Sequence, residues 1–295
     1  MDLAIMIEGQ DGLTWKRWKR LASAAEDFGF AGLYRSDHFT NAQPPEKDSL
    51  ELWVSLAYLA TQTKRIVFGP LVSPFSFRHP AITARMAAAI DDLSGGRLQL
   101  GLGAGWQDRE HDMFGLDLIE IGPRMRRFRE GLEVVNKLMN SDKPFSYSGK
   151  FYQLEDAIML PRPQRAGGPP IVVGGNGKRT LQLAAKYASE WNGTGQTPAT
   201  FRERSQQLDE FLKAEGRKPA DLRRTLMIGT FFGSDAAKLE RVVKISGRSK
   251  DELRANGRLV GGADKITEQL GELQEAGCQR VMLQWLDQND IDGLE

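Results

Sequence analysis

Short apolar stretches rich in β-branched residues alternate with longer amphipathic stretches along the whole chain of 295 residues. Such apolar stretches predict β-strands. They cover residues 3–7, 31–36, 65–72, 98–103, 170–175, 190–194, 225–233 and 280–285. Between them, apolar residues recur at intervals of three and four, as in residues 15–30, which is the spacing of one helix face. Further helical patterns cover residues 51–63, 79–96, 122–140 and 263–278.

This alternation indicates repeated βαβ units and therefore a parallel sheet. About eight units is the count of a TIM barrel, whereas a doubly wound open sheet more often has five or six strands. We predict an α/β fold, a single (β/α)8 TIM-barrel domain over residues 1–295, with insertions after strand 4 and before strand 8. The first insertion ends in residues 144–160, which alternate like a hairpin around Ser148-Gly149, and the second, residues 234–262, is charged and helical in pattern.

Composition narrows the classes of partner. Lysine and arginine number 40 against 39 acidic residues, so a net charge of +1 supplies no field to attract nucleic acid or an anionic membrane. The single cysteine, Cys278, allows no internal disulfide, and no stretch approaches the roughly 20 apolar residues of a membrane helix. We therefore expect a cytoplasmic protein that acts on a small molecule, with no nucleic acid and no membrane as partner.

The three histidines of the chain all follow predicted strands, at the end where a barrel carries its active site. Asp37-His38 is a candidate acid–base pair, because an imidazole titrates near neutral pH and an adjacent acid tunes it. The alternative is that Asp37 caps the next helix. His79 precedes Pro80, which is placed like a first helical residue, so capping is its expected role. His111 lies in a loop beside the predicted mouth; of the two positions open to it, lining the mouth or the surface, we favour the surface.

Other chemistries lack their sequence signatures. No HxH, HExxH or CxxC pair occurs, so the histidines and nearby acids do not have the spacing of a catalytic metal site. No GxSxG motif occurs either, and the only cysteine is far from a strand end, which disfavours nucleophilic hydrolase chemistry.

A glycine-rich loop, Gly103-Ala104-Gly105, follows the fourth strand. Its glycines lie at the predicted barrel mouth, where a flat ring would approach the backbone. The loop is not GxGxxG, and no acid ends a second strand in the manner of a dinucleotide fold, so it is weak evidence for a nicotinamide coenzyme.

A second glycine-rich loop, Gly174-Gly175-Asn176-Gly177-Lys178, follows the fifth strand. Glycines, a helix start and a lysine coincide here, and this combination suits a phosphate, because backbone N–H groups and the helix N-terminus attract an anion. The alternative is a plain tight turn.

Taken in order, these loops resemble the bacterial luciferase-like superfamily, whose barrels bind flavin or the deazaflavin coenzyme F420. The resemblance is carried by Ser36-Asp37-His38-Phe39, Gly69 to Pro74, Phe77 to Ala81, Leu93 to Arg97, the run LQLGLGAGW with Glu110 and Phe114-Gly115, Pro161-Arg162-Pro163, the loop after strand five, and Ala188 to Asn192. The DHF motif and the GAGW stretch look most like the F420-dependent branch.

The resemblance implies roles for individual residues. Asp37 and His38 would flank the redox face of the ring, with His38 as proton donor. A non-proline cis peptide at Leu71-Val72, after Pro70, would bulge against the back of the ring.

It also implies a coenzyme-binding set along the next strand ends. The loops Gly103-Ala104-Gly105 and Gly174 to Lys178 would contact the coenzyme, the second at its phosphate, together with Asn192. The F420-dependent sugar-phosphate dehydrogenases of this family carry a glutamate where this chain has Trp106, which argues against a sugar phosphate and leaves Glu110 as the substitute catalytic acid.

The expected function is therefore an F420-dependent oxidoreductase that transfers a hydride between the deazaflavin C5 and a small organic substrate. The alternative is an FMN-dependent monooxygenase, in which reduced flavin reacts with oxygen. A barrel aldolase or isomerase acting on a sugar phosphate, and a flavin-binding barrel without catalysis, are more distant alternatives. By analogy with the family we expect a homodimer.

Overall fold

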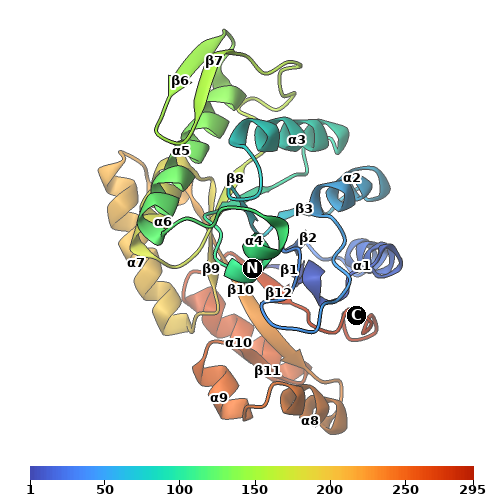
Figure 1. Ribbon diagram of the computed structural model, residues 1–295. Coiled ribbons are helices and arrows are strands. Elements are labelled where there is room, and N and C mark those ends of the chain that lie inside the picture. Colours follow the sequence, from blue (N-terminus) through green and yellow to red (C-terminus); the bar gives the residue numbers. More distant parts are fainter.

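The structure is a computed structural model that describes residues 1–295. Its centre is a barrel of parallel strands surrounded by helices (Figure 1). The strands in chain order are β1 (Asp2–Ile7), β2 (Gly32–Arg35), β3 (Val67–Pro70) with β4 (Ser73–Pro74), β5 (Leu100–Gly103), β8 (Ile171–Gly174), β9 (Glu190–Thr194), β10 (Arg223–Phe232) and β12 (Arg280–Gln284). Because β3 and β4 are two parts of one strand, the barrel has the eight strands that the sequence predicts.

Pairing between the strands brings the sheet round into a barrel. The order of neighbours is β3-β2-β1-β12-β10-β9-β8-β5-β4, and every pair along it is parallel. An isolated parallel bridge between Phe68 and Leu98 links β3 to the segment before β5. The α/β barrel prediction is confirmed.

Helices alternate with the strands and cover the outside of the barrel. They are α1 (Trp15–Asp27), α2 (Leu52–Gln62), α3 (Pro80–Leu93), α5 (Ile121–Asn140), α6 (Lys178–Tyr187), α7 (Pro198–Ala214) and α10 (Ala263–Glu275). Several begin at a side-chain cap; the Thr14 and Thr197 hydroxyls accept the N–H of Arg17 and Thr200, three residues on. Single-turn 3-10 segments cover Gly9–Asp11 and Pro219–Asp221. None of the helices has the length and apolar character needed to cross a bilayer.

Two insertions depart from the repeating pattern. After β5 come α4 (Asp108–Phe114) and, beyond α5, an antiparallel hairpin of β6 (Phe145–Ser148) and β7 (Gln153–Ala157). Before β12 come α8 (Ala236–Ile245), α9 (Lys250–Ala255) and β11 (Leu259–Gly261), which pairs with the end of β10. Figure 1 shows the β6-β7 hairpin on the opposite side of the barrel from α8 and α9, with α4 over the middle of the barrel. Both insertions were expected from the sequence, whereas the short strand β11 was not.

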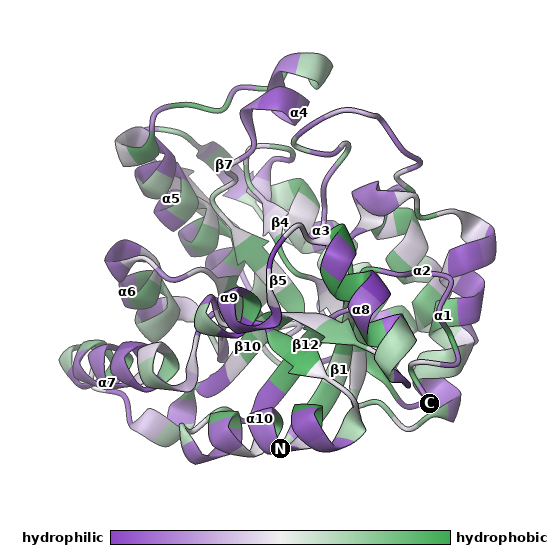
Figure 2. Cartoon of the chain, turned by 90° about the horizontal axis from the view of Figure 1, so that it is seen from below, coloured by the Kyte–Doolittle hydropathy of each residue, from purple (hydrophilic) through white to green (hydrophobic).

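The core lies between the barrel and its helices. Trp18 and Trp191 are fully buried there, in one apolar cluster that spans most of the elements. Figure 2 shows the apolar strands at the centre and polar residues on the outer helices. Cys278 is buried, as expected for a small apolar side chain.

A buried polar cluster fills the barrel at the N-terminal ends of its strands. Arg280 donates from Nη1 to the Tyr34 hydroxyl at 2.7 Å and to Glu190 Oε2 at 3.3 Å. Burial raises the pKa of Glu190, although Arg280 and the Thr225 hydroxyl oppose that effect. This end of the barrel is packed, so the space for a ligand lies at the other end.

Candidate active site

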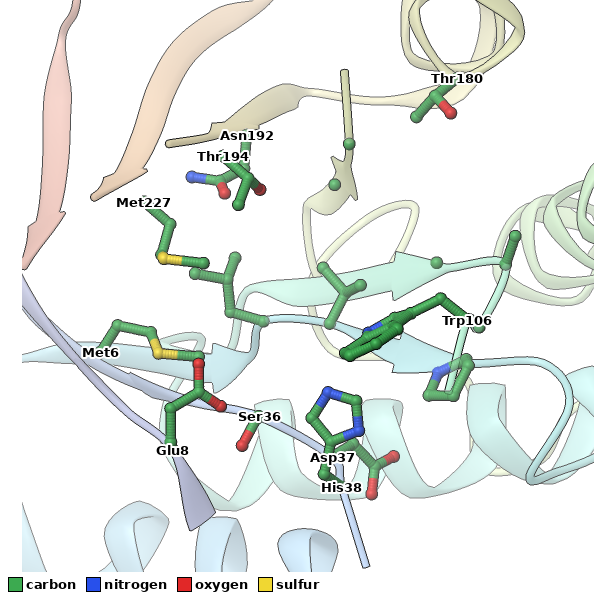
Figure 3. A pocket seen from close by; sticks show the side chains of 18 of the residues that line it. Met6, Glu8, Ser36, Asp37, His38, Trp106, Thr180, Asn192, Thr194 and Met227 are labelled. Atoms are coloured by element: carbon green, nitrogen blue, oxygen red, sulfur yellow. The ribbon is translucent and has the colours of Figure 1, made fainter. Parts of the chain in front are cut away.

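A cavity of about 540 Å³ opens at the C-terminal ends of the strands. Figure 3 shows the side chains that line it, which come from strands all around the barrel. Of the candidate catalytic and coenzyme-binding residues, those lining it are Asp37, His38, Leu71, Val72, Gly103, Ala104, Gly105, Glu110, Gly174, Gly175 and Asn192. Pro70, Asn176, Gly177 and Lys178 do not line it. The barrel therefore brings most of the candidate residues to one place.

The floor of the cavity is apolar and is shaped by the break between β3 and β4. The Leu71-Val72 peptide is cis, as the family resemblance implied. Val72 reaches toward two neighbouring strands: a Cβ added at Gly103 would lie 2.5 Å from Val72 Cγ2, and one at Gly174 would lie 2.8 Å from Val72 Cγ1. Glycine at these two positions lets the valine lie across the barrel, and the result is a surface that suits a flat ring.

His38 is held by a buried carboxylate. Its Nδ1 lies 2.8 Å from Glu110 Oε1, and Glu110 Oε2 accepts the Phe39 N–H at 2.9 Å. The Glu110 side chain is 1% exposed and that of His38 is 19% exposed. Burial alone would lower the pKa of His38, but the hydrogen bond and charge of Glu110, with Glu8 and Asp37 farther away, raise the pKa above its ordinary value. The imidazole is therefore stabilised as imidazolium.

The acid that contacts His38 is Glu110 and not its neighbour in sequence, although the charge of Asp37 also raises the pKa of His38. Asp37 instead accepts the Ser73 hydroxyl at 2.6 Å and the guanidinium of Arg78, with Nη1 at 2.5 Å. It does not cap the next helix, whose N-cap is Glu51. Asp37 thus anchors the loop that carries His38 to β4 and the segment after it.

The other two histidines have structural positions. His79 is the N-cap of α3, and its Nδ1 accepts the Ala81 N–H at 3.2 Å, so the capping prediction is confirmed. The assignment of His111 to the surface is wrong, because His111 is only 1% exposed. The helix α4 folds over the loops, so that His111 packs 4.9 Å from the Phe77 ring and its Nδ1 lies 2.6 Å from the Gln107 carbonyl oxygen.

The glycine loop after β8 leads directly into α6, whose N-cap is Gly177. The first N–H groups of a helix lack intrahelical partners, so this helix start offers donors to an anion. Thr180, in the first turn of α6, lines the cavity and adds a hydroxyl. The Lys178 side chain is exposed and outside the cavity, so only its backbone belongs to this helix start.

Two polar groups of the same loop form hydrogen bonds within the protein and are not available to a ligand in the cavity. The Gly175 N–H donates to the Asn192 carbonyl at 2.9 Å. Asn176 donates from Nδ2 to the Thr194 carbonyl at 2.8 Å and accepts the Thr194 N–H at 3.0 Å. These contacts tie the loop to β9 and fix the start of α6.

One end of the cavity was not anticipated from the sequence. It is lined by Met6, Glu8, Met227, Gln284 and Arg258. Figure 3 shows Met6, Glu8 and Met227 on one side of the cavity and Thr180 on the far side. Glu8 and Gln284 lie at strand ends, where the search that found His38 would also have found them. Arg258 belongs to the second insertion.

The groups that line the cavity fit a flavin-type coenzyme. The apolar surface at Leu71 and Val72 suits a ring, and the N-terminus of α6 with Thr180 suits a phosphate. No group of three or more His, Cys, Asp or Glu side chains is arranged to hold a metal ion.

Comparison with known proteins gives relatives of two kinds. The sequence profile of the family described as luciferase-like monooxygenase matches residues 4–282. The chain is 34% identical to 4-hydroxyprotoasukamycin monooxygenase of Streptomyces nodosus subsp. asukaensis, over 56% of this chain and 43% of that protein. It is 32% identical to F420-dependent hydroxymycolic acid dehydrogenase of Mycobacterium tuberculosis, over 58% of this chain and 46% of that protein. The chain thus spans less than half the length of these two relatives.

Solved structures share the fold at low sequence identity. An F420-dependent secondary alcohol dehydrogenase in complex with an F420-acetone adduct superposes with a TM-score of 0.88 at 18% identity, covering 99% of this chain and 96% of that one. The monooxygenase RslO1 from Streptomyces bottropensis superposes with a TM-score of 0.83 at 19% identity, covering 100% and 96%.

Proposed function

This chain belongs to the luciferase-like monooxygenase family, and from that membership we propose that it is an F420-dependent oxidoreductase. It would transfer a hydride between the deazaflavin C5 and a small organic substrate. Relatives named as F420-dependent dehydrogenases support this choice, and relatives named as monooxygenases make FMN-dependent oxygenation the second candidate.

The observation that carries the proposal is the ion pair of His38 and Glu110 inside the cavity. Interconversion of an alcohol and a carbonyl moves a proton at oxygen together with each hydride. A buried carboxylate that favours imidazolium supplies such a proton donor at neutral pH. Because Nδ1 is held by Glu110, Nε2 is the ring nitrogen left to face a reactant.

The remaining residues would bind and orient. When bound, F420 supplies a two-electron carrier that reacts poorly with oxygen. Leu71 and Val72 provide the apolar surface for its ring, and the α6 N-terminus with Thr180 provides the anion site for its phosphate. Asp37 keeps the His38 loop fixed through Arg78, so the imidazole does not need to reorient during the reaction.

Separate titrations with F420 and FMN, each followed by coenzyme fluorescence, test the choice of coenzyme. We expect micromolar binding of F420 and no binding of FMN in the same range. Tight FMN binding, with oxygen consumed when reduced FMN is supplied, would refute the proposal and favour the monooxygenase. Binding of neither would exclude both.

A pair of histidine variants tests the role of His38. His38→Ala is expected to keep the affinity for F420 and to lose turnover, because the substitution removes the proton donor and leaves the apolar surface intact. The matched control is His79→Ala, which removes a cap outside the cavity and is expected to lower stability while keeping turnover. Undiminished turnover in His38→Ala would remove this residue from the mechanism. The homodimer and the cytoplasmic location stay predictions.

A further inference from the structure

Arg258 is the only lysine or arginine among the residues that line the cavity. It lies in the second insertion, between α9 and β11, and no step of the proposed hydride transfer uses it. We propose that Arg258 is a specificity residue that binds an anionic group of the substrate, which is therefore an organic acid bearing a carboxylate, phosphate or sulfate. The word substrate rests on the proposed function, whereas the anion site itself does not.

The guanidinium group has almost no partner within the protein. Its only hydrogen bond runs from Nη1 to the carbonyl of the preceding residue, Gly257, at 3.3 Å. No carboxylate forms an ion pair with it, and burial, with the nearby charge of Arg248, lowers its pKa. A guanidinium carries five N–H donors in a fork that matches a carboxylate or a phosphate, so most of its binding capacity is free.

The acids of the cavity are engaged elsewhere. Glu8 accepts from Gln284 Nε2 at 2.5 Å and from Gln10 Nε2 at 2.9 Å. Asp37 is paired with Arg78, and Glu110 with His38. None of them forms an ion pair with Arg258, so its partly buried positive charge is uncompensated and favours binding of an external anion.

The backbone beneath the side chain leaves room for it. A Cβ added at Gly229, in β10, would lie 2.6 Å from Arg258 Cδ, and one at Gly195, after β9, would overlap its Nη1. The strand β10 and the residue directly after β9 thus carry glycine where the arginine passes on its way to the cavity. The arginine is fitted into the barrel mouth and is not a free surface side chain.

The turn before Arg258 is also fixed against the barrel. Gly257 has a φ of +65°, and a Cβ there would lie 2.6 Å from the backbone carbon of Gln196. The insertion therefore packs directly on the loop after β9, which fixes the backbone that carries Arg258 in advance of a ligand. Preorganisation of this kind reduces the entropy cost of binding.

The phosphate of the coenzyme is the other possible source of an anion. The α6 N-terminus with Thr180 already provides a phosphate site after β8. Arg258 instead lies against Gly195, which follows β9, and Gly229 of β10, and it lines the cavity together with Met227 and Gln284. We therefore assign its anion to the substrate.

Crystals of the coenzyme-loaded protein soaked in sodium selenate test this assignment through the anomalous signal of selenium. We expect a peak within hydrogen-bond distance of the Arg258 guanidinium with the coenzyme in place, and no such peak in Arg258→Gln. No peak in the wild type would overturn the proposal. A coenzyme phosphate bound to Arg258 would overturn it too, because the anion would then belong to the coenzyme.

Calorimetric titration of the loaded protein with sulfate supplies a solution measurement. Loss of a charge-assisted hydrogen bond is expected to weaken sulfate binding about tenfold or more in Arg258→Gln. The matched control is Arg241→Gln, an exposed arginine of the same insertion that lies outside the cavity, and it should bind sulfate as the wild type does. Equal affinity in all three proteins would refute the role of Arg258.

The outcome is separable from that of the proposed function. If the protein takes FMN and not F420, the same crystals and titrations are made with FMN. A selenate peak at Arg258 would then still stand while the F420 assignment fails.

Discussion

Replacing Glu110 with glutamine tests whether a buried carboxylate keeps His38 protonated. Glutamine has nearly the same shape, and its amide oxygen can still accept the Phe39 N–H that Glu110 accepts at 2.9 Å. What disappears is the negative charge 2.8 Å from His38 Nδ1. Burial, which lowers the pKa of His38, then acts with little opposition, so that pKa is expected to fall below its ordinary value of 6.5.

The size of the effect follows from the burial of the pair. A hydrogen bond to a charged group contributes about 1.5–3 kcal/mol, and about 1.4 kcal/mol is a factor of ten in an equilibrium. Because Glu110 is 1% exposed and His38 is 19% exposed, water screens this pair only weakly. The ratio of imidazolium to imidazole at His38 should therefore fall at least tenfold, and turnover that needs the proton should fall with it.

Nuclear magnetic resonance of the histidine rings measures this directly, since the chain has only three histidines. Ring nitrogen shifts recorded against pH would give the pKa of His38, with His79, whose pKa is lowered by burial, as an internal comparison. In the wild type the pKa of His38 should lie above that of His79. In Glu110→Gln the pKa of His38 should fall to that of His79 or below it. An unchanged His38 titration in the variant would refute the reasoning.

Three further predictions follow from the same structure. Because the folded pKa of His38 is raised, its protonation stabilises the fold fully below pH 6.5 and this stabilisation is lost as pH rises through the folded pKa; thermal melts of wild type and His38→Ala should converge over that window. Gly101→Ala would place a methyl group against the Pro70 carbonyl and should lower the free energy of unfolding in urea by about 1–3 kcal/mol. Gly271→Ala, which has open space around it in α10, should raise that free energy by about 0.5–1 kcal/mol. Equal stability of the two variants would contradict the packing argument. Asp37→Asn removes a buried, charged acceptor and should lower the free energy of unfolding by about 1.5–3 kcal/mol, which the same titration would show.

The barrel was readable from the sequence because each strand is short, apolar and bounded by glycine or polar residues. The helix expected over residues 15–30 ends at Asp27, and the one over 79–96 ends at Leu93. The sequence therefore predicted that these helices exist better than it predicted where they end. Helix ends depend on caps and tertiary contacts that periodicity does not record. The strand β11 has three residues and lies within a charged insertion, too short for a periodic signal.

The site was predictable where it lies at strand ends and not where it depends on folding of the insertions. His38 was found by that rule, but its partner Glu110 is 72 residues away in sequence and reaches it only because α4 folds over the mouth. The same folding buries His111. Glu8 directly follows β1 and could have been found by the strand-end rule, whereas nothing in the sequence around Arg258 indicates that it reaches the cavity.

The central claim is that F420 occupies this cavity, with its ring on Leu71-Val72 and within reach of His38. A crystal structure of the protein grown with equal concentrations of F420 and FMN tests it most directly. The account predicts electron density for F420 on the apolar surface, with its phosphate at the N-terminus of α6. Density for FMN in that place, or for F420 bound elsewhere, would contradict it.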